Sequence, residues 1–95
     1  MKSGEGLIEQ GIEDLANEAE TIPALLVSIG EPRLRRSGVN IPDNTLESPE
    51  HRLYFLLQDI YADDAHSMYN WWIRELIRIE RAIENGVLSA NRESY

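Results

Sequence analysis

The stretch IEQGIEDLANEAETIPALLVSI, residues 8–29, carries the most regular apolar pattern in the chain. Its apolar residues recur at alternating intervals of four and three positions: Ile8, Ile12, Leu15, Ala19, Ile22, Leu26 and Ile29. This spacing places their side chains on one face of an α-helix. We therefore predict a first helix over about residues 5–29, ended by Gly30.

Pro23 interrupts this first helix. Proline lacks a backbone N–H, and its ring clashes with the preceding turn of a helix. We expect the first helix to be kinked at Pro23. The alternative is a short break near Thr21 and Ile22, where the Thr21 side chain could cap a fresh start that has Pro23 in its first turn.

Residues 30–48 are rich in glycine, proline and asparagine, which are typical of loops. We predict a long loop over this range, between the first and second helices. Loops of this length are uncommon in compact domains and often carry function. We expect Val39, Ile41 and Leu46 to fold it back onto the helices.

Two more helices are predicted after this loop. Ser48-Pro49-Glu50 is typical of a helix start, with a capping hydroxyl, a proline in the first turn and an acid at the positive end of the dipole. The adjacent aspartates Asp63 and Asp64 favour a break near residues 62–66 over one continuous helix. Asn85-Gly86 predicts the end of the third helix near residue 84, with residues 85–95 as a cap and loose tail.

The sequence thus predicts an all-α fold in a single domain over residues 1–95. Its architecture is a small bundle of three main helices, with the first kinked at Pro23 and a loop over residues 30–48.

Composition narrows the possible partners. The chain has no cysteine and a formal net charge of −8, which repels phosphate backbones and attracts basic protein surfaces. We therefore expect no direct binding to nucleic acid. No apolar run approaches the roughly 18 residues of a membrane span, so no membrane contact is predicted. The start, Met1–Gly6, lacks the apolar core of a signal peptide, and we expect a cytoplasmic protein.

The pair Trp71-Trp72 suggests an interaction surface. Neighbouring helical residues point about 100° apart, so both indoles cannot face the core. Trp72 falls in line with the apolar stripe, whereas Trp71 falls beside Arg74 and Arg78. Tryptophan and arginine dominate binding hot spots, so we predict partner binding by this surface and by acids of the first helix, namely Trp71, Arg74, Arg78, Glu9, Glu13 and Asp14. The alternative is that Trp71 packs under the long loop or against the first helix.

Two further groups of charges need partners. Glu80 falls on the apolar face of the third helix, where an unpaired charge is costly. It could pair with Arg52 or Arg81, lie at a subunit boundary, or turn outward on a slightly rotated helix. Residues 33–36 hold three arginines, which could pair with the acidic first helix or grip a phosphate or a carboxylate.

A metal site is the alternative chemistry. Asp63 and His66 form an acid-x-x-His pair, which resembles half of the di-iron ligand set of ferritin-like proteins, although those use glutamate. The resemblance implies that glutamates of the first helix, such as Glu13 or Glu18, or a second subunit complete the shell. The alternative for Asp63 and His66 is a capping aspartate followed by a solvent-facing histidine. No nucleophile–base–orienter set and no phosphate-binding glycine loop can be assembled, so neither catalysis nor a cofactor is predicted.

These features together predict a non-enzymatic protein-interaction module that self-associates as a homodimer. It would act as an inhibitor, as an immunity or antitoxin-like factor, or as an adaptor. Its partner would be another protein with a basic surface, such as a nucleic-acid-handling enzyme. The alternative is a ferritin-like metal-binding protein that uses Asp63, His66 and glutamates of the first helix.

Overall fold

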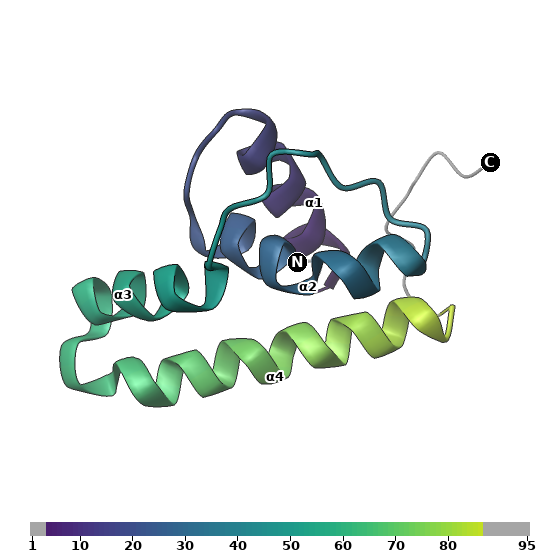
Figure 1. The fold of residues 1–95 in the computed structure, drawn as a ribbon. Coiled ribbons are helices and arrows are strands. Elements are labelled where there is room, and N and C mark those ends of the chain that lie inside the picture. Colours follow the sequence, from purple (N-terminus) through teal and green to yellow (C-terminus); the bar gives the residue numbers. More distant parts are fainter. Residues whose placement is uncertain (1–3, 87–95) are drawn as a thin grey trace.

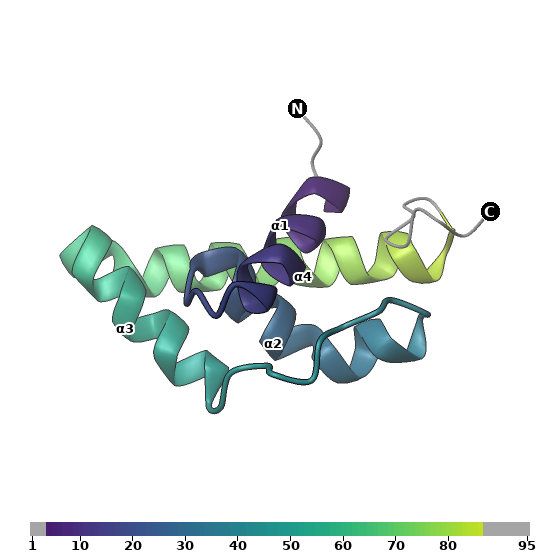
Figure 2. The same cartoon turned by 90° about the horizontal axis from the view of Figure 1, so that it is seen from above.

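A computed structural model describes residues 4–86, with side chains from residue 6 onward. Its helices are α1 (Gly4–Ala16), α2 (Ile22–Arg36), α3 (Pro49–Tyr61), the short 3-10 helix η1 (Ala62–Asp64) and α4 (Ala65–Glu84). Residues 4–86 contain no strand, which confirms the predicted all-α fold. The helices α3 and α4 form an antiparallel hairpin, and α2 packs on both (Figure 1). Seen from above, α1 lies across α2 (Figure 2).

The predicted first helix is two helices rather than one kinked helix. α1 ends at Ala16, Glu18 takes a positive φ of 59°, and α2 begins at Ile22. Thr21 caps α2 by accepting the Ala24 N–H at 3.2 Å, and its hydroxyl donates to the Asp14 carboxylate at 2.6 Å. The prediction of a kink was therefore wrong, and the alternative of a short break was right. The single apolar stripe becomes two stripes that face each other.

The predicted end at Gly30 was also wrong, because α2 continues through Pro32 to Arg36. Gly30 faces α4 at close range, and Leu34, one turn further, is buried. These contacts outweigh the cost of proline and glycine inside a helix. The loop is therefore shorter than predicted and covers residues 37–48. Val39 and Ile41 are buried as predicted, and the half-buried Leu46 donates its N–H to the buried Ser28 hydroxyl at 3.0 Å.

The ends of α3 and α4 follow the sequence closely, except in their capping. α3 begins at Pro49 as predicted, but Ser48 takes a left-handed conformation and its hydroxyl caps nothing. The predicted break occurs after Tyr61, where Ala62 takes a φ of 53°, yet the Asp64 side chain makes no capping bond. α4 ends at Glu84, followed by Gly86 with a φ of 78°. The predicted tail after residue 86 lies outside the described residues.

The interior consists of two adjoining apolar clusters, and α2 contributes to both. The first joins α1, α2, the loop and α4, through Ile8, Leu15, Ala24, Val27, Leu34, Val39, Ile41 and Ile79. The second joins α2 to the hairpin, through Leu25, Leu26, Leu53, Leu57, Ala65 and Leu76. Leu7 and Leu46 pack against both clusters. The hairpin is thus held to the rest of the molecule through one of its faces.

Candidate protein-binding groove

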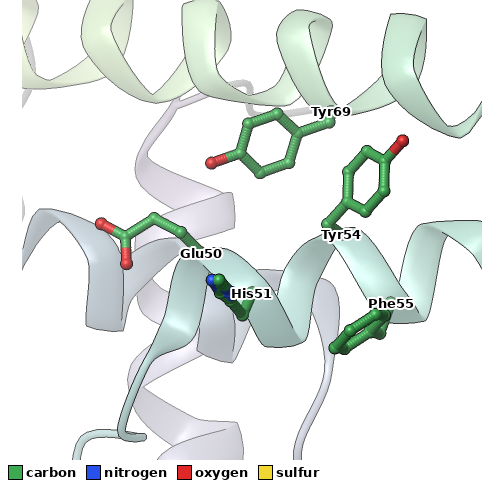
Figure 3. Close-up of a pocket in the computed structure, with 5 residues that line it drawn as sticks. All are labelled: Glu50, His51, Tyr54, Phe55 and Tyr69. Atoms are coloured by element: carbon green, nitrogen blue, oxygen red, sulfur yellow. The ribbon is translucent and has the colours of Figure 1, made fainter.

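A groove of about 360 Å³ opens between α3 and α4, and its lining is largely aromatic. Figure 3 shows this groove from outside the hairpin, with α1 and α2 behind it. Its lining residues are Glu50, His51, Tyr54, Phe55 and Tyr69. We refer to these five residues as the aromatic groove.

Contacts between rings shape the aromatic groove. Tyr54 of α3 and Tyr69 of α4 meet edge to face, with ring centres 5.8 Å apart and planes at 75°. The His51 and Phe55 rings, one turn apart on α3, lie 6.5 Å from each other. Burial, and then the nearby Glu50 charge, raise the pKa of Tyr69. The Tyr69 phenol therefore stays protonated at neutral pH and can donate a hydrogen bond.

Helix geometry explains why Phe55 is exposed. Leu53 and Leu57 are fully buried, and Phe55 lies between them in sequence. Two positions along a helix turn the side chain by about 200°, so Phe55 points away from the core that the leucines enter. Phe55 is 64% exposed, the largest value among the large apolar residues that the structure describes. Together with the apolar groove that it lines, Phe55 forms an exposed apolar surface of the kind that binds partner proteins.

The surroundings of the aromatic groove are acidic. Residues 47–64 contain five carboxylates, at Glu47, Glu50, Asp59, Asp63 and Asp64, against a single arginine, Arg52. All five residues are exposed, and none forms an ion pair within residues 4–86. Arg52 pairs instead with Glu20 at 2.9 Å. The segment of residues 47–64, which contains Phe55, therefore carries an excess of negative charge that favours cationic partners.

The sequence-predicted surface on α4 is only partly assembled. Trp71 is 44% exposed and packs edge-on against Trp72, with ring centres 4.9 Å apart. Arg78 donates one hydrogen bond to Glu75 at 2.6 Å, and both Arg74 and Arg78 are exposed. The Trp72 indole N–H is buried and has no hydrogen-bond partner among the described residues. Trp71 and its arginines share a helix surface, but they line no part of the aromatic groove.

The predicted acids of α1 lie apart from the aromatic groove, which only α3 and α4 line. Asp14 serves the fold, because its carboxylate accepts hydrogen bonds from Gln10 and from the Thr21 hydroxyl. Glu9 is half-buried, and Glu13 is exposed. None of the predicted partner-binding residues lines the aromatic groove.

Glu80 is buried, and its partner is Arg33 rather than Arg52 or Arg81. Glu80 is 6% exposed, and the Arg33 Nη1 lies 3.2 Å from its Oε1. The same guanidinium also makes two hydrogen bonds to Glu84. Burial raises the pKa of Glu80, against the opposing charge of Arg33, whereas the bond from Arg33 lowers the pKa of Glu84. Arg33 therefore fastens α2 to α4 and does not pair with the acidic α1 as predicted.

The residues of the metal-binding alternative do not converge. Asp63 lies in η1, and His66 lies in the first turn of α4, 3.3 Å from the Asn70 amide. α1, which carries Glu13, packs on α2 away from the tip of the hairpin (Figure 1). No group of three or more histidine or acidic side chains that could hold a metal ion occurs within the described part of the chain.

Comparison of the chain with protein-family models, with curated proteins and with solved structures gives no match. Within residues 4–86, no helix has the length and apolar character needed to cross a membrane.

Proposed function

We propose that this chain is a non-enzymatic protein-interaction module, whose aromatic groove binds a partner protein with a basic surface. The observation that carries this proposal is the exposed Phe55, which lines the aromatic groove on a helix that also carries the exposed acids Glu50 and Asp59. An apolar side chain of the partner would pack against Phe55 and against the paired Tyr54 and Tyr69 rings. Lysine or arginine residues beside it would meet Glu50 and Asp59. This combination of an apolar centre and a charged rim is the usual anatomy of a protein interface.

Such a module acts by occupying a surface of another protein. The acidic field suits it to cover a basic cleft, including one that otherwise holds nucleic acid, in the manner of an inhibitor, an immunity or antitoxin-like factor, or an adaptor. We place this interaction in the cytoplasm, because a chain without cysteine cannot form the disulfides that an oxidising compartment favours.

The chemistry of the partner can be tested with a displayed library of random 20-residue peptides. We expect the retained peptides to combine a large apolar residue with several lysines or arginines. Phe55→Ala should weaken their binding by about tenfold or more, because truncation of a central hot-spot residue has effects of this size. Binding of the individual peptides would be measured by fluorescence anisotropy.

Two further variants locate the binding site. Ile60 is 54% exposed on the same helix but lies outside the groove lining, so Ile60→Ala should leave binding unchanged. Trp71→Ala tests the surface that the sequence singled out. Loss of binding with Trp71→Ala, together with normal binding of Phe55→Ala, would move the site to the outer surface of α4 and refute the groove.

A further inference from the structure

We infer that the occupant of the aromatic groove is an amphipathic α-helix of the partner protein, with lysine or arginine along the flank that faces α3. This inference rests on the proposed function and adds the conformation and charge pattern of the bound segment.

The shape of the hairpin surface favours a helix. α2 packs on α3 and α4 from one side, and the aromatic groove opens on the hairpin between them (Figure 3). Tyr69, Ile73 and Ile77 recur every four residues along α4 and so lie on one flank of that helix, and Tyr69 of these lines the groove. Ile77 is 37% exposed. From Tyr69 to Ile77 the axis of α4 advances by about 12 Å, which is about the length of two turns of a bound helix.

Backbone hydrogen bonding gives the second argument. The groove walls are two helices, whose backbone N–H and C=O groups pair within each helix except in the first turn of α3, where Ser48 provides no side-chain cap. Along most of the groove an extended peptide would find no free backbone partners and would bury its own polar groups, which costs free energy. A helix satisfies its backbone internally and presents only side chains. Recognition of an apolar helical face in a hydrophobic groove is an established mode of peptide binding.

Charge gives the third argument and selects another protein over a second copy of this chain. Glu50 lies in the groove lining, and Asp59 follows Phe55 by one turn of α3. Both are exposed and form no ion pair with any described residue. Two copies with a formal net charge of −8 each repel one another, and a second α3 would bring the same acids to the interface. A cationic flank on a different protein meets these carboxylates favourably.

The test uses three labelled 18-residue peptides and the full chain. The first is an alanine-based helix with leucines at intervals of four along one face and lysines along one flank. In the second a central alanine is replaced by proline, which breaks the helix. In the third, glutamates replace the lysines. We expect the first peptide to bind at least about tenfold more tightly than either of the others.

Matched variants separate this inference from the proposed function. Glu50→Gln should weaken binding of the lysine peptide by about threefold, as expected for one exposed charge pair, whereas Glu18→Gln on the α1–α2 turn should not weaken it.

Equal binding of the proline peptide, still dependent on Phe55, would overturn the helical occupant but not the groove as a binding site. Equal binding of the glutamate peptide would overturn the cationic flank. A dimer by sedimentation that dissociates on Phe55→Ala would assign the groove to a second copy. If no peptide here or from the displayed library depends on Phe55, the proposed function itself fails.

Discussion

Replacement of Gly11 by alanine is expected to lower the free energy of unfolding by about 3 kcal/mol, even though alanine favours helices by about 1 kcal/mol. A methyl group on Gly11 would lie 2.5 Å from Val27 Cγ2 and 2.8 Å from the carbonyl carbon of Pro23, with the Pro23 carbonyl oxygen as its nearest atom. The Pro23 carbonyl is part of the backbone in the first turn of α2, so it cannot rotate away as a flexible side chain would. The crossing of α1 over α2 must therefore widen.

Urea unfolding followed by circular dichroism measures this loss. For a domain of this size, a loss of about 3 kcal/mol corresponds to a fall in the melting temperature of more than about 10 °C. The control is Glu13→Ala, an exposed change in the same helix, which should alter stability by no more than about 0.5 kcal/mol. Equal midpoints for the two variants would mean that α1 does not cross α2 at Gly11.

Arg33→Met is expected to destabilise the protein by about 2 kcal/mol at pH 7 and by much less at pH 4. Leaving a fully buried charge without its partner costs about 3–5 kcal/mol. The expected loss is smaller here, because the Arg33 side chain is 35% exposed. The variant keeps an unbranched side chain against α4 but leaves Glu80 and Glu84 without their cation.

The pH dependence follows from the directions of the two pKa shifts. Burial raises the pKa of Glu80 in the fold, so neutral Glu80 is tolerated at low pH and its cost grows as pH rises through that pKa. Removal of Arg33 raises this pKa further. Arg33 lowers the pKa of Glu84, so the stability that this pair supplies is present above the unfolded pKa of Glu84 and is lost as pH falls. Both effects shrink the difference between the wild type and the variant in acid.

A second substitution checks the assignment to Glu80. In the Arg33→Met background, Glu80→Gln removes the stranded charge while nearly preserving its volume, and should recover most of the lost stability at pH 7. Urea midpoints at pH 4 and pH 7 give all the required comparisons. A loss that is the same at both pH values and is not reduced by Glu80→Gln would rule out a buried unpaired carboxylate as its cause.

Local features of the sequence predict most of the helices. The Thr21 cap before Pro23 and the adjacent aspartates at the hairpin tip act within a few residues, and the structure has a helix boundary at each, whereas the apolar period of residues 8–29 predicted one helix where the structure has two. The continuation of α2 through Pro32 depends instead on the contact of Gly30 with α4, about fifty residues away in the sequence. From the sequence alone, a glycine that permits close packing cannot be distinguished from a glycine that ends a helix.

The candidate site was less predictable than the fold. Trp71 was predicted as a binding residue because two adjacent side chains of one helix cannot both face the core, and this argument needs only local helix geometry. The aromatic groove needs the pairing of Tyr54 with Tyr69, and this pairing depends on how α3 and α4 align in the hairpin. Phe55 alone had a local signal, since it lies opposite Leu53 and Leu57 on the helix.

The two apolar clusters have a consequence for how the molecule responds to a ligand. Leu7 at the start of α1 and Leu46 at the end of the loop each belong to the surroundings of both clusters, so neither cluster can open without exposing part of the other. The chain should therefore melt as one cooperative unit. A ligand that grips only α3 and α4 would then raise the melting temperature of the whole protein, including helices that it never touches.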